Sequence, residues 1–114
     1  YGSGQAINIG DYLIGIGYRL IHAARELDSA AALDVLNSMS TAHIRLCDGQ
    51  GAEMAFQDKP DWNLTPLDAL QIYSLKTSPA FEAALYAGLR MAGHPLANTD
   101  VIAQFCRHTG VAFQ

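Results

Sequence analysis

The residues best suited to bind an anion are a lysine and a threonine that follow each other, Lys76 and Thr77. Their neighbours are largely apolar, and lysine is rarely buried unless it is paired. Pro79 is expected to interrupt the helix just after them. The ammonium group, the hydroxyl and the N–H groups freed at such a break would together bind a phosphate. The alternative is a surface lysine whose stem lies along apolar neighbours, and spacing alone favours it.

A second candidate is Gln50, which stands between Gly49 and Gly51 within a helical pattern. Glycines on both sides of one amide indicate a close neighbour, either another helix or a ligand. Glu53 follows three residues later, so its side chain is expected on the same face as Gln50. Two interpretations stay open: an amide that lines a pocket, and a buried amide hydrogen-bonded to backbone.

Asn8 and Asp11 form a further polar pair three residues apart, with Gly10 between them. A glycine inside a helix costs roughly 1 kcal/mol relative to alanine, so a closely approaching helix is expected to compensate for Gly10. We expect Asn8 and Asp11 to cap or cross-link neighbouring helices rather than to take part in catalysis.

The histidines and cysteines show no spacing typical of a metal site, and no glycine-flanked nucleophile accompanies them. Cys47 and Cys106 lie far apart, and we expect two buried free thiols in a cytoplasmic protein. The sequence therefore predicts no metal ligands of its own.

The elements that must position these residues are helices, because apolar residues recur at helical spacing and no strand-like alternation competes. A wide apolar face over residues 7–21 predicts a first helix buried on most sides. Further helices are expected over residues 30–36, 39–56, 66–75, 79–91 and 100–109. Asp28 and Thr65 are the expected N-caps, Gly93 and Gly110 the expected ends, and residues 57–63 a loop. Short connections predict an all-α, antiparallel helical bundle.

Composition narrows the classes of function. Half of the 114 residues are hydrophobic and 16% are charged, which suffices for a packed core. The formal net charge is −4, and the few basic residues are scattered, so nucleic acid is not an expected partner. The chain contains no apolar run of the ~18 residues that a membrane span needs.

Four segments, in order, resemble motifs of the trans-isoprenyl diphosphate synthases, also called polyprenyl synthetases. YGSGQAINIGDYLIG at residues 1–15 resembles the family's GxxQAxNxGDxL helix, and DGQGAE at residues 48–53 resembles GQxxD. Lys76-Thr77 resembles the family's KT motif, and GVAFQ at residues 110–114 resembles GxAFQ. Glu53 stands where aspartate is commoner. The resemblance covers nearly the whole chain and implies an isoprenoid-synthase type of helical bundle, incomplete here.

The resemblance also implies roles for single residues. Lys76 and Thr77 would hold the allylic diphosphate, Gln114 would lie near the reacting carbons, and Gln50 and Phe113 would line the same cavity. The implied reaction condenses isopentenyl diphosphate with an allylic diphosphate to give a longer polyprenyl diphosphate. It implies Mg²⁺ held by two aspartate-rich motifs, and a homodimer in the cytoplasm.

The chain departs from the family in its aspartates, because it contains no Asp-Asp pair. Both aspartate-rich motifs would lie outside residues 1–114, so we expect a central portion of one helical domain that is inactive by itself. The start at Tyr1 and the apolar segment before Gln114 favour this interpretation. The alternative is a non-catalytic helical partner or interaction module that kept the fold.

Overall fold

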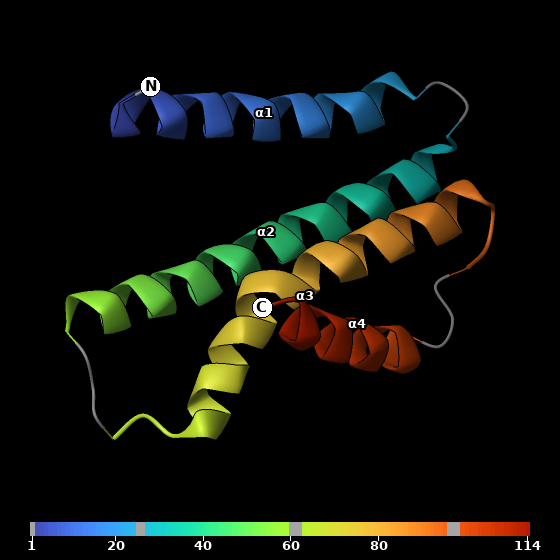
Figure 1. Ribbon diagram of the computed structural model, residues 1–114. Helices are drawn as coiled ribbons and strands as arrows, with labels where there is room; N and C mark the ends of the chain where they lie inside the picture. Colours follow the sequence, from blue (N-terminus) through green and yellow to red (C-terminus); the bar gives the residue numbers. More distant parts are fainter. Residues whose placement is uncertain (1, 25–26, 60–62, 96–98) are drawn as a thin grey trace.

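The computed structural model describes residues 2–24, 27–59, 63–95 and 99–114. They form four helices: α1 (Ser3–Ala23), α2 (Ser29–Asp58), α3 (Pro66–Met91) and α4 (Thr99–Phe113). The described ranges contain no strand, so the all-α prediction is confirmed. Consecutive helices run in opposite directions, and α3 lies between α2 and α4 (Figure 1). None of the helices in the described ranges is long and apolar enough to cross a membrane.

Helix α2 is a single helix of 30 residues, so the predicted break near Asn37 and Ser38 is wrong. Its N-cap is Asp28, as predicted, because the Asp28 carboxylate accepts a hydrogen bond from the Ala31 backbone N–H at 2.8 Å. The buried residues of α2 recur at intervals of four and seven: Ala31, Val35, Ala42 and Gly49. This continuous stripe packs on α3 and outweighs the weak helix propensities of asparagine and serine.

Helix α3 begins as predicted, with Thr65 as N-cap and Pro66 at the first helical position. The Thr65 hydroxyl accepts from the Asp68 backbone N–H at 3.2 Å, and the Asp68 carboxylate accepts from the Thr65 backbone N–H at 2.8 Å. The helix then continues through Pro79, so the predicted interruption there is wrong. Proline removes one backbone hydrogen bond and bends a helix. Figure 1 shows the matching change of direction along α3.

The end of α3 agrees with the prediction, whereas the end of α4 does not. Gly93 follows α3 with a φ of +77°, a left-handed conformation that favours glycine. Gly110, by contrast, lies inside α4, which continues to Phe113. A Cβ atom at Gly110 would lie 2.8 Å from the Ser78 backbone nitrogen, so this glycine allows α4 to press against α3. The predicted helix break at Gly110 is therefore wrong, and its physical role is close packing.

Helix α1 lies beside α2 but touches it at few points, and none of its described residues is buried. The prediction of a first helix buried on most sides is wrong for this chain. No atom outside the helix lies within 4 Å of a Cβ placed at Gly10, so the expected close approach is absent there. The main polar link is between the Tyr18 hydroxyl and His43 Nδ1, which are 3.3 Å apart.

Two further predictions concern the connections. Helix α2 extends to Asp58, so the predicted loop over residues 57–63 begins later than expected, and residues 60–62 lie outside the described part of the chain. The last helix begins at Thr99, one residue before the predicted start at residue 100, and residues 96–98 also lie outside the described part of the chain.

Candidate functional site

The site is built where α2 and α3 touch through their backbones. Gly49 is buried, and a Cβ atom there would lie 2.6 Å from the Leu75 carbonyl carbon and 2.8 Å from Lys76 Cα. Such distances are shorter than any ordinary contact, so only glycine fits. The contact fixes the backbone of Lys76 against α2.

One turn further along α2, Glu53 meets Lys76. Glu53 Oε2 lies 2.6 Å from Lys76 Nζ, and the two side chains are 22% and 25% exposed. The Gln50 amide donates to the same Glu53 oxygen at 3.3 Å. The predicted common face of Gln50 and Glu53 is confirmed, but Gln50 itself is exposed, so the alternative of a buried amide is wrong. An ion pair that solvent still reaches adds at most about 1 kcal/mol to stability, so its main effect is to orient Lys76.

The next residue of α3 faces the other neighbouring helix. The Gln114 amide donates a hydrogen bond of 2.5 Å to the Thr77 hydroxyl. One turn along α3, the rings of Phe81 and Phe113 meet edge to face with centroids 6.1 Å apart. Phe81 was not among the predicted site residues, although its place four residues after Thr77 puts it on the same helical face.

The five predicted site residues therefore fall into two adjacent groups around residues 76 and 77 of α3. Gln50 joins Lys76 through Glu53, while Phe113 and Gln114 join Thr77 and Phe81. One part of the prediction is wrong. Because α3 is continuous at these positions, its backbone N–H groups are not freed for an anion; Pro79 frees a carbonyl instead. Anion binding at Lys76 must rest on side chains.

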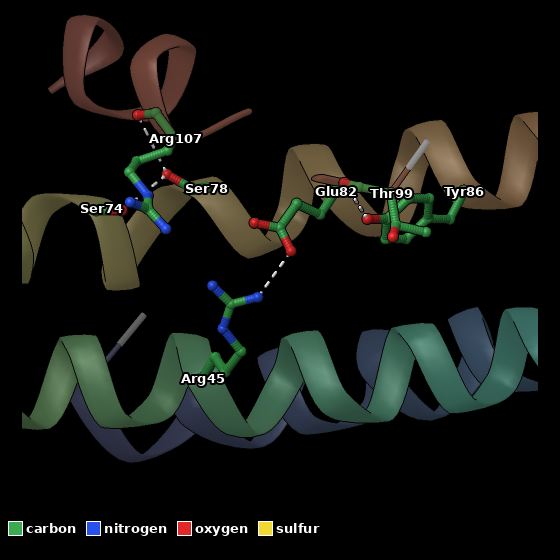
Figure 2. Close-up of polar contacts among 7 residues, drawn as sticks. All are labelled: Arg45, Ser74, Ser78, Glu82, Tyr86, Thr99 and Arg107. Atoms are coloured by element: carbon green, nitrogen blue, oxygen red, sulfur yellow. Dashed lines mark hydrogen bonds and ion pairs between the residues drawn. The ribbon is translucent and has the colours of Figure 1, made fainter. Parts of the chain in front are cut away.

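A second row of polar contacts fixes α3 between its neighbours (Figure 2). Arg45 Nη1 of α2 reaches Glu82 Oε2 of α3 at 2.7 Å. On the α4 side, the buried Ser78 hydroxyl donates to the Arg107 carbonyl at 3.4 Å, and the Tyr86 hydroxyl donates to the Thr99 carbonyl at 3.2 Å. These contacts link α3 to α2 on one side and to α4 on the other.

The two cysteines differ in their surroundings. Cys106 is buried, and burial together with the charge of Glu82 raises the pKa of its thiol. It is therefore protonated and inert at neutral pH. Cys47 is free as predicted but exposed, so the expectation of two buried thiols is wrong for this residue.

Hollows in the surface add little to the site. A hollow of about 240 Å³ adjoins Glu53 and is bordered by Phe56, Ile72 and Tyr73. A larger one, of about 750 Å³, lies between the first half of α3 and α4, and none of the five predicted site residues lines it.

Magnesium binds to clustered oxygen ligands, chiefly carboxylates. Within the described ranges, no three His, Cys, Asp or Glu side chains gather closely enough to hold a metal ion. Glu53 is engaged with Lys76 and Gln50. The described side chains therefore do not fit a magnesium site.

Comparison with known proteins identifies the family of this chain. The polyprenyl synthetase family matches residues 1–114. The (2E,6E)-farnesyl diphosphate synthase of Mycobacterium tuberculosis is 27% identical over 114 residues, which cover 100% of this chain and 30% of that protein. The geranylgeranyl diphosphate synthase of Sulfolobus acidocaldarius is 29% identical over 115 residues, covering 100% of this chain and 34% of that protein. The short chain isoprenyl diphosphate synthase of Methanocaldococcus jannaschii is 27% identical, with 33% of its length covered.

The chain spans about a third of the length of the curated relatives that it matches. No solved structure matches it at a significant level. The family match nevertheless extends from the first residue to the last and includes every motif residue described above. The protein therefore belongs to the polyprenyl synthetase family.

Proposed function

We propose that residues 1–114 are the central part of a prenyltransferase that condenses isopentenyl diphosphate with an allylic diphosphate. The observation that carries this proposal is the pair of contacts at neighbouring residues of α3: Lys76 pairs with Glu53 of α2, and Thr77 accepts from Gln114, which follows α4. Gln50 of α2 is linked to Lys76 through Glu53. The names of the relatives, all diphosphate synthases, support it.

The proposed chemistry of these residues is recognition and orientation. The Lys76 ammonium group binds the diphosphate of the allylic substrate as a charge-assisted donor, and the Thr77 hydroxyl stands beside it. The rings of Phe81 and Phe113 contact each other, and we propose that they border the hydrocarbon part of the substrate. The Gln114 amide, which donates to the Thr77 hydroxyl, is proposed to lie near the reacting carbons, as the family resemblance implies. Such a site favours loss of pyrophosphate by holding developing negative charge in fixed donors.

The proposed requirement for magnesium rests on the family resemblance alone. The ions would neutralise the departing pyrophosphate, held by the two aspartate-rich motifs that residues 1–114 do not contain. We accordingly propose that the chain is part of a single helical domain and has no activity by itself. A homodimer and a cytoplasmic location complete the proposal, the latter supported by the two free cysteines.

The direct test is product formation by the full-length protein. Labelled isopentenyl diphosphate and geranyl diphosphate should yield a longer, acid-labile prenyl diphosphate when Mg²⁺ is present, and none when it is chelated. Absence of product with every short allylic diphosphate, from a protein that melts cooperatively, would reject the proposal.

A second candidate is a non-catalytic helical partner, and the exposed apolar side chains of α1 favour it. Tyr12, Leu13 and Leu20 are 68%, 61% and 65% exposed, a surface suited to another protein. Formation of a prenyl product excludes this candidate. A stable complex with a second protein, together with inactivity under all conditions above, would support it.

A further inference from the structure

Lys76, the proposed diphosphate ligand, is already paired with a negative charge. The 2.6 Å contact between Lys76 Nζ and Glu53 Oε2 is the shortest ion pair in the described part of the chain. Both side chains are about a quarter exposed, so water screens the pair only in part. An ammonium group with an adjacent carboxylate carries little net charge toward an approaching anion.

Glu53 is itself held in place. Gln50 donates to the same carboxylate oxygen that accepts from Lys76, so this oxygen lies between two donors. Glu53 also stands one helical turn after Gly49, where the backbones of α2 and α3 touch. The carboxylate therefore cannot move far from Lys76 when an anion arrives.

A diphosphate that binds Lys76 consequently meets two opposing effects. The ammonium group attracts it, while the fixed carboxylate behind that group repels it. Lysine has three N–H donors and Glu53 uses one, so binding remains possible but is weaker than for an unpaired lysine.

Resting on the proposed function, we propose that Glu53 is a fixed counter-charge to Lys76 that weakens binding of free pyrophosphate and speeds its release. Gln50 acts in this arrangement as the residue that positions Glu53, rather than as a substrate ligand. Glu53 touches no reacting atom and acts through Lys76.

The first experiment measures affinity for inorganic pyrophosphate in the full-length protein with Mg²⁺, by titration calorimetry. Glu53→Gln keeps the shape and an acceptor oxygen for Lys76 but removes the charge, so it is expected to bind pyrophosphate roughly tenfold more tightly. Glu53→Asp keeps the charge and should remain within a few-fold of wild type. Glu82→Gln is the matched control, since it removes the same charge from the ion pair with Arg45 and should leave pyrophosphate affinity unchanged.

The second experiment asks whether Glu53 acts through Lys76. In the Lys76→Ala background, Glu53→Gln should no longer tighten pyrophosphate binding, because the paired cation is gone. Gln50→Ala should tighten binding in the presence of Lys76, by less than Glu53→Gln, because it frees Glu53 without removing its charge.

Three results would overturn the assignment: pyrophosphate binding by Glu53→Gln that equals or is weaker than wild type, a gain that persists without Lys76, or weaker binding by Gln50→Ala. Lys76→Ala separates this proposal from the function itself. If Lys76→Ala weakens pyrophosphate binding while Glu53→Gln leaves it unchanged, only the counter-charge proposal is wrong. If Lys76→Ala binds pyrophosphate like wild type, the diphosphate site and the counter-charge both fail.

Discussion

At the scale of single residues, the environment of Lys76 decides which groups are available for the proposed binding of a diphosphate. The residue lies within a continuous helix whose N–H groups are committed to other backbone carbonyls. In the proposed site, a diphosphate would therefore be bound by the Lys76 ammonium group and the Thr77 hydroxyl, whose partners are Glu53 of α2 and Gln114 just after α4. Hydrogen bonds to charged groups contribute about 1.5–3 kcal/mol each, so one side chain can carry much of the affinity.

Replacing Lys76 with alanine in the full-length protein is expected to raise the KM for the allylic diphosphate by about 10- to 150-fold. The physical reason is the loss of a charge-assisted hydrogen bond to the diphosphate. Steady-state kinetics with varied allylic substrate measure the effect. Lys59→Ala is the control, because Lys59 is an exposed lysine just after α2 and should leave KM unchanged. Equal KM values for the two variants would remove Lys76 from the site.

Helical periodicity sufficed to predict which site residues share a face within one helix. Gln50 and Glu53 are three residues apart and do form a hydrogen bond. The pairing of Glu53 with Lys76 was beyond such reasoning, because it depends on how far α2 is shifted along α3. That shift is set by packing between distant parts of the chain. The glycine at position 49 did indicate a close neighbour, but the sequence around it does not show which helix that neighbour is.

At the scale of elements, packing between helices outweighed the residues that were expected to interrupt them. Asn37, Ser38, Pro79 and Gly110 each predicted an interruption, and all lie inside helices. Each costs about 0.5–3 kcal/mol locally, whereas a long helix face buries several side chains on its neighbour. N-terminal signals fared better, since Asp28 and Thr65 act on atoms within their own first turn. The start of a helix depends on local residues and could be predicted from the sequence. Whether the helix continues depends on tertiary contacts.

The contact at Gly49 yields a stability prediction. Gly49→Ala is expected to destabilise the protein by about 1–3 kcal/mol, because the new Cβ collides with the backbone of α3. Gly51→Ala is the matched control on the same helix, since no atom lies within 4 Å of its Cβ position. That change should stabilise by up to about 1 kcal/mol through helix propensity. Urea unfolding of both variants measures the difference, and a similar gain from both would contradict the close contact.

The start of α3 yields a pH prediction. Hydrogen bonds from the Thr65 side chain and backbone lower the pKa of Asp68 below its ordinary value. Because the pKa is lowered, Asp68 stabilises the fold at pH values above its ordinary pKa of 3.8. This stabilisation is lost as the pH falls through the pKa of Asp68 in the folded protein. Thr65→Ala should cost about 1 kcal/mol at neutral pH through the lost cap. In thermal melts from pH 7 to pH 3, the gap between wild type and variant should narrow below about pH 4. A constant gap would show that Asp68 does not contribute.

At the scale of the whole molecule, burial is concentrated where α3 meets its two neighbours. Ser78, Pro79 and Cys106 are all fully buried, and Val35 is buried on α2. Helix α1 presents its apolar residues outward, although its sequence pattern predicted burial. A pattern reports that a face is apolar, but it does not identify the surface that covers it.

The two cysteines offer a test of where the side chains are buried. Cys47 is expected to react with a thiol reagent in the native protein within the mixing time of a conventional assay. Cys106 should react only as α4 opens from α3, because its side chain is buried and burial raises the pKa of its thiol. Mass-resolved labelling with single-cysteine variants distinguishes the two rates. Equal rates for both thiols would contradict the packing of α4 on α3.

The contact at Gly49 has a consequence for which positions of this chain can vary independently. Helices α2 and α3 cannot slide past each other while their backbones touch there, and a slip of one turn would move Glu53 about 5.4 Å along its partner. A substitution at Glu53 or Lys76 would therefore change the charges of that ion pair without changing the alignment of the two helices. That alignment depends on Gly49, a residue that has no side chain.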